Sequence, residues 1–303
     1  NDTVEAKPDT TEDFTVNTTT LVSSLTNSLN SKSLGFSKPK DKQDRENQTS
    51  RYKKYRFMSN MLGNTLDMIK QVNPDVVIKV MPIIDIEAIT SVDAKGQYDS
   101  STNTIYLSKE MVDSNKPLNT SSYVVHEMFH ALTEKNMNPE IIDALRHSDK
   151  PSDKRIVNAY DELDKIREQA LNASDTDKFS KDIVFYDVGE MISYMYSNPM
   201  VMDWVLNNVS TKVKGVAGNS KLQAIKGFLN SILDKVSIIL GLNREAKANL
   251  HNINKLVAEV MMDSSIKGTL PTTTHIRRAD QGIEDEVNEK SFKEVLKGLD
   301  NRQ

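Results

Sequence analysis

The stretch VVHEMFHALTE, residues 124–134, places a glutamate directly after the first of two histidines that are four positions apart. On an α-helix, a side chain four positions along returns to nearly the same face, so His126 and His130 can present imidazole nitrogens to one ion. Glu127 lies about 100° around the helix from His126, where it can reach a water on that ion without being a ligand. The spacing therefore predicts a helix with a metal site.

A glutamate in this position suits hydrolysis, because it can take a proton from a water that attacks a carbonyl and deliver it to the leaving amine. The alternative is a solvated polar stripe on a half-exposed helix. We favour the metal site because Met128 and Phe129 lie between the histidines. Burying His, Glu and His among such residues is costly unless a metal or hydrogen bonds satisfy them.

The flanking sequence predicts an α+β fold. DVVIKVMPIIDI (75–86) is rich in β-branched residues and NTIYLS (103–108) is a second short apolar run, so we expect two strands of a small sheet before the motif. Apolar residues recur at helical spacing before and after these strands. We expect helices at 48–72, 138–147, 154–172, 186–197, 200–209, 219–240 and 244–262.

NTIYLS followed by SSYVVHEMFHALTEKNM resembles zincin metallopeptidases over roughly residues 75–200. The resemblance implies a zincin-like fold, a Zn²⁺ ion held by His126 and His130, and Glu127 as general base and then acid. It also implies that the NTIYLS strand is an edge strand that aligns an extended peptide by backbone pairing. The expected activity is zinc-dependent hydrolysis of a protein or peptide substrate.

A catalytic zinc needs a third protein ligand and an open position for water. The metzincin subclass is excluded, since Thr133 and Asn136 occupy its Gly and His positions. In gluzincins a later helix supplies a glutamate, and we expect Glu190, which apolar residues flank. The alternative is a first-turn carboxylate that the helix dipole stabilises. The other candidate ligands are Asp187, Asp182, Glu162 and His147.

Tyr194 and Tyr196 follow Glu190 on the same segment. A tyrosine hydroxyl can donate to the oxyanion of a tetrahedral intermediate, and we predict this catalytic role for Tyr194. The alternatives are His147 as the donor and both tyrosines as core residues.

Composition restricts the partners. The net charge of −4 comes from 39 basic and 43 acidic residues that are interspersed, so no global field favours nucleic acid or an anionic membrane. The chain has no cysteine, so a metal site must use histidine and carboxylate ligands. The longest apolar-leaning run, 227–242, contains Asp234 and Lys235 and is too short to span a bilayer. We expect no transmembrane segment.

Polarity divides the chain into four parts. Residues 1–47 have few large apolar groups, so we expect a disordered arm. We expect the zincin-like domain at 48–210, a helical hairpin lobe at 211–262 and a polar tail at 263–303.

DVGEMISYMYSNPMVMDWV resembles the stretch after HExxH in zincin-like domains of large phage and mobile-element polyproteins, some of them virion components. The start at Asn1, without a secretory leader, fits a fragment of a longer chain. The resemblance implies virion or other phage proteins as partners. It leaves the location open, with the virion and the host cytoplasm as the two candidates. One alternative function is therefore a virion or ejected protein that uses the fold as an assembly module. Another is an interaction protein that docks through helices 219–262. The intact Glu127 favours an enzyme.

Overall fold

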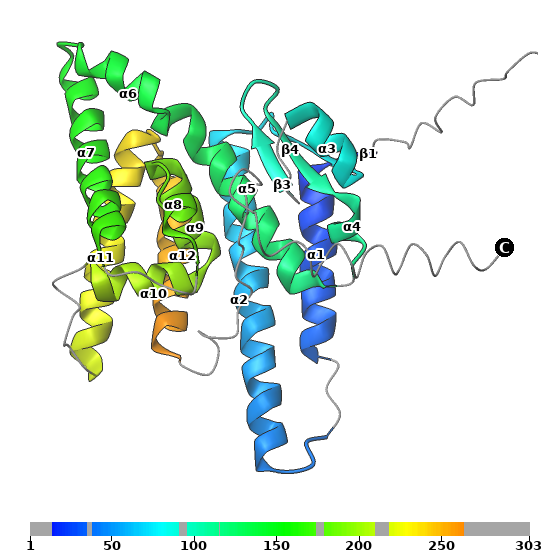
Figure 1. The fold of residues 1–303 in the computed structure, drawn as a ribbon. Coiled ribbons are helices and arrows are strands. Elements are labelled where there is room, and N and C mark those ends of the chain that lie inside the picture. Colours follow the sequence, from blue (N-terminus) through cyan, green and yellow to red (C-terminus); the bar gives the residue numbers. More distant parts are fainter. Residues whose placement is uncertain are drawn as a thin grey trace, which may run out of the picture.

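The structure is a computed structural model that describes residues 14–34, 38–90, 96–114, 116–173, 179–209 and 218–263. These residues are mostly helical and include one small sheet, so the expected α+β class is confirmed (Figure 1). The strands are β1 (Phe14–Val16), β2 (Val77–Met81), β3 (Gly96–Asp99) and β4 (Thr104–Ser108). The helices are α1 (Thr18–Leu34), α2 (Lys42–Val72), α3 (Ile83–Thr90), α4 (Lys109–Val112), α5 (Pro117–Met137), α6 (Pro139–Arg146), α7 (Pro151–Asn172), α8 (Lys181–Val184), α9 (Val188–Ser197), α10 (Pro199–Asn208), α11 (Gly218–Ile239) and α12 (Arg244–Met262).

The sheet has the strand order β1-β2-β4-β3 among the described residues. β2 and β4 are parallel, with Val77 opposite Thr104, and β1 and β3 pair antiparallel at the two edges. The expectation that 103–108 is an edge strand is therefore wrong. β3 takes that place because the chain turns back tightly before β4, through Asn103 in the left-handed conformation (φ 51°), which asparagine tolerates better than most residues.

The expected strand at 75–86 is shorter in the structure, where β2 ends at Met81. The carbonyl of Pro82 accepts the N–H groups of Asp85 and Ile86 as α3 begins. Proline has no N–H for a sheet ladder and a φ near the helical value, so it suits a helix start better than a strand interior.

Residues 14–34 form β1 and α1 and contradict the disordered arm that we expected over 1–47. One face of α1 packs on α2 and α5. Its buried residues are Leu21, Val22, Leu25 and Leu29. The low average hydrophobicity of the segment concealed this pattern, since a helix needs only one apolar stripe to pack on a core. Residues 1–13 lie outside the described part of the chain.

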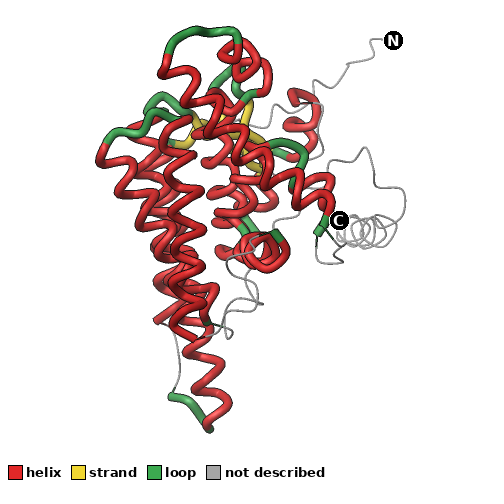
Figure 2. Tube along the Cα trace, turned by 90° about the vertical axis from the view of Figure 1, so that its left-hand side faces the viewer, coloured by secondary structure: helices red, strands yellow, loops and turns green. Residues whose placement is uncertain are grey.

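One hydrophobic core joins most of the helices to the sheet. α5 packs against β3 and β4 on the sheet and against α2 and α9 among the helices. The sheet lies towards one end of the long helices (Figure 2). α11 and α12 pack on each other. In addition, α11 packs on α7 and α12 packs on α2, so the described part of the expected 211–262 lobe shares this core. The expected tail at 263–303 falls outside the described residues except for Asp263.

Candidate metal centre

α5 carries the HExxH motif through the core. Pro117 stands in its first turn, where a missing N–H costs no hydrogen bond. The helix then buries most of its side chains, and His126 and Glu127 are only 1% and 3% exposed. These two polar groups are therefore not part of a solvated stripe, and they need partners inside the fold.

Glu190 approaches the same place from α9. The side chain of Asp187 caps this helix and accepts a hydrogen bond of 2.8 Å from the Glu190 N–H. Glu190 therefore lies in the first turn, where the helix dipole favours a carboxylate. Gly189 leaves room for this cap, because a Cβ there would stand 3.2 Å from Oδ1 of Asp187.

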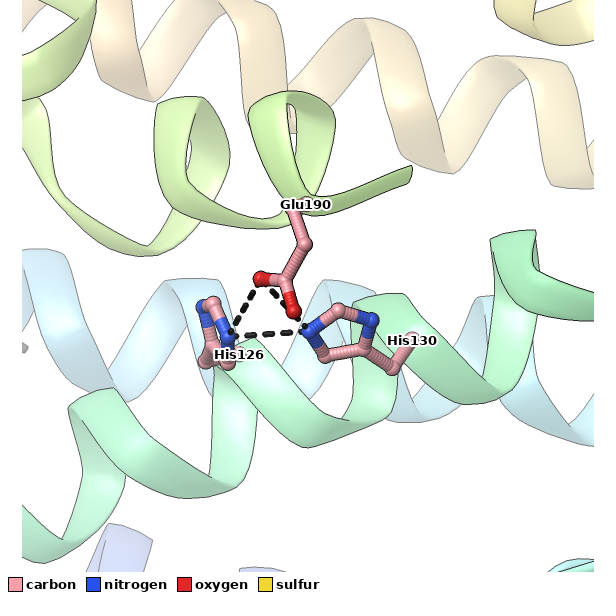
Figure 3. Close-up of side chains that lie close together, drawn as sticks. All are labelled: His126, His130 and Glu190. Atoms are coloured by element: carbon pink, nitrogen blue, oxygen red, sulfur yellow. Dashed lines mark hydrogen bonds and ion pairs between the residues drawn. The ribbon is translucent and has the colours of Figure 1, made fainter. Parts of the chain in front are cut away.

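His126, His130 and Glu190 converge on one point (Figure 3). The two Nε2 atoms are 3.0 Å apart. Oε2 of Glu190 lies 3.3 Å from Nε2 of His130 and 3.8 Å from Nε2 of His126. The cluster could therefore hold a metal ion with one atom from each residue.

The charges in this cluster perturb two pKa values. Burial lowers the pKa of His130. The charge of the Glu190 carboxylate and its hydrogen bond raise this pKa by a larger amount, so the resulting value is about 9. Burial raises the pKa of Glu127 to about 7, and the charge of His130 opposes this increase. Glu127 can therefore exchange a proton near neutral pH, whereas His130 keeps its proton there.

Glu127 lies outside the three-residue cluster and contacts the edge strand β3. Its Oε2 accepts a hydrogen bond of 2.8 Å from the Tyr98 N–H. Gly96 allows this approach, because a Cβ there would stand 3.4 Å from Cγ of Glu127 and 3.2 Å from Cδ2 of Leu107. Sequence reasoning missed this contact, since a backbone donor leaves no motif and the GQYD strand is too short to show alternation.

The two tyrosines of α9 are buried. The ring of Tyr194 packs against the imidazole of His126, with centroids 4.4 Å apart. Tyr196 stacks on Phe129 at 4.9 Å with an interplanar angle of 3°. Tyr196 is thus a core residue. Tyr194 reaches the cluster through its ring, and its role as an oxyanion donor stays a prediction.

The alternative third ligands lie elsewhere in the described part of the chain. Asp187 is the cap of α9, His147 is the C-cap of α6, Asp182 belongs to α8, and Glu162 pairs with Lys235 at 2.9 Å. None of the four belongs to the cluster that could hold an ion.

Ser197 is a site residue that sequence reasoning missed. Its Oγ lies 3.2 Å from Nδ1 of His126, and the residue is 2% exposed. The available signal was its spacing, since Ser197 follows Glu190 by two helical turns and so shares its face of α9.

Comparisons with models of protein families, with curated proteins and with solved structures found no match to this chain. None of the described helices has the length and apolar character needed to cross a membrane.

Proposed function

We propose that the chain is a zinc metallopeptidase of the gluzincin type, in which His126, His130 and Glu190 hold the ion and Glu127 is the general base. The observation that carries the proposal is the convergence of the three ligand atoms in a largely buried place, beside a further buried carboxylate on the same helix.

The donor set fits zinc. Ligand atoms about 2.0–2.2 Å from a tetrahedral zinc ion lie roughly 3.4 Å from one another. The observed separations of 3.0, 3.3 and 3.8 Å surround this value. Three protein ligands leave a fourth position for water, as catalytic sites require. When bound, zinc would act as a Lewis acid that lowers the pKa of water and polarises a carbonyl.

The residues around the ligands support hydrolysis of a peptide. The water oxygen attacks the carbonyl carbon, Glu127 takes the water proton, and the same proton passes to the nitrogen as the C–N bond breaks. Burial raises the pKa of Glu127 to about 7, and a bound cation nearby would lower it, which favours the carboxylate form that a general base needs. The Tyr98 N–H restrains this carboxylate. β3 is an edge strand in the described sheet, so an extended peptide could pair with it beside Glu127.

Substitution of Glu127 by glutamine tests the proposal. Glu127→Gln should keep the fold and about one zinc ion per chain, because the residue is not a ligand, while cleavage of an unstructured protein such as casein falls roughly a hundredfold or more. The matched control is Glu134→Gln. Glu134 is also on α5, but it accepts a hydrogen bond from Ser100 and is not in the cluster. This variant should keep cleavage.

Elemental analysis and a cleavage assay on the same preparations separate the outcomes. Unchanged cleavage by Glu127→Gln would remove the general base from the proposal. A wild-type chain that binds no zinc would refute the metal centre. Zinc binding without any cleavage would favour the assembly-module alternative.

A further inference from the structure

α9 contacts His126 from more than one side. Oε2 of Glu190 lies 3.8 Å from Nε2 of the imidazole, and Oγ of Ser197 lies 3.2 Å from Nδ1. The ring of Tyr194 packs on the imidazole between these two contacts along the helix. The three residues follow one another at spacings of four and three, so they share one face of α9.

The two ring nitrogens of His126 have different surroundings. Nε2 faces the other ligand atoms, so in a metal-bound state Nδ1 carries the proton and needs an acceptor. The Ser197 hydroxyl is within hydrogen-bond distance of Nδ1 and can accept this proton. His126 and Ser197 are 1% and 2% exposed, so bulk water is poorly placed to replace the hydroxyl.

The backbone around Ser197 is held in place. The hydroxyl of Ser122, one turn before His126 on α5, donates to the Ser197 carbonyl at 3.3 Å. Asn198 ends α9 with its N–H bonded to the Tyr194 carbonyl at 2.8 Å, and its side chain caps α10. Rotation of the Ser197 side chain is therefore the main freedom left to the hydroxyl.

We infer that Ser197 is a positioning residue, which fixes the tautomer and ring orientation of His126 for metal binding through Nε2. It contacts neither the metal position nor the substrate. The inference rests on the proposed metal centre. It means that α9 supplies both a ligand and the support of a ligand that belongs to α5.

The test compares zinc affinity in three variants by competition with a chromophoric chelator. Ser197→Ala should bind zinc roughly 10–100-fold more weakly than the wild type, the usual effect of losing such a support. Ser193→Ala is the matched control, since Ser193 is on the same helix, equally buried, and its hydroxyl has no hydrogen-bond partner in the described structure. Its affinity should not change. Ser197→Thr keeps the hydroxyl and should retain most of the affinity.

A second readout covers the case in which Ser197→Ala fails to fold well. ¹⁵N NMR of the zinc-loaded wild type should show the Nδ1–H tautomer of His126 with slow proton exchange, and Ser197→Thr should preserve this signal. Equal zinc affinity in Ser197→Ala and the wild type, or a proton on Nε2 rather than Nδ1 of His126 in the zinc-loaded wild type, would overturn the inference. Cleavage is not measured in this test. A wild type that binds zinc without hydrolysing peptides would refute the proposed peptidase activity, and the zinc affinity of the Ser197 variants would still decide the positioning role. A wild type that binds no zinc would overturn both.

Discussion

His130 and Glu190 form an ion pair, with 3.3 Å between Nε2 and Oε2. Burial alone would lower the pKa of His130, but the carboxylate raises it to about 9. Since the folded value lies above the ordinary 6.5, the stability that this proton contributes is complete below pH 6.5 and is lost as pH rises through about 9. A metal ion must displace the same proton from Nε2.

This competition predicts that zinc affinity rises with pH. Between pH 7 and 8.5 the affinity should increase by up to about tenfold per pH unit, because His130 must lose its proton before it can bind the ion. At pH 8 each zinc should release about one proton. Calorimetric titration in two buffers of different ionisation enthalpy measures the release. An affinity that does not depend on pH in this range would contradict the ion pair.

At the residue scale, the sequence predicted the groups whose spacing is fixed by a helix. His126, Glu127 and His130 follow from periodicity, and Glu190 follows from being an isolated carboxylate among apolar residues. The Ser197 hydroxyl and the Tyr98 N–H were not predictable in this way. They reach the site through tertiary contacts. Spacing places Ser197 on the Glu190 face of α9, but it does not show that this face meets His126.

At the scale of elements, α1 shows where composition misleads. The segment is polar on average, yet Leu29 is fully buried on the face that packs against α2. The edge strand was misassigned for a related reason, since the four residues of β3 are too few to display a pattern. Longer helices such as α7 and α12 were predicted well because their stripes extend over several turns.

Removal of the Leu29 side chain tests whether α1 belongs to the folded core. Leu29→Ala should reduce the free energy of unfolding by about 2–5 kcal/mol, because it removes apolar burial and leaves a cavity. Ser24→Ala, at an exposed position of the same helix, should change it by less than about 0.5 kcal/mol. Urea denaturation followed by circular dichroism measures both. Equal midpoints for the two variants would mean that α1 does not contribute to stability.

At the scale of the whole molecule, the candidate metal centre joins two parts of the chain that are distant in sequence. α5 supplies two of the ligand atoms and packs on the sheet, whereas α9 supplies the third and packs on α7 and α10. An ion at this point would therefore connect the sheet side of the core to its helical side. The unfolded chain has no such arrangement, so zinc should bind the folded state almost exclusively.

Zinc should consequently raise the melting temperature of the wild type. A free zinc concentration 100-fold above Kd stabilises the folded state by about 2.7 kcal/mol, which should raise Tm by several degrees in a chain of this size. Glu190→Ala removes the ligand that belongs to α9, so its Tm should rise much less at the same zinc concentration. Differential scanning fluorimetry at several zinc concentrations measures this difference. If zinc raised Tm equally in Glu190→Ala and the wild type, the ion would be bound without α9, and Glu190 would not be the third ligand.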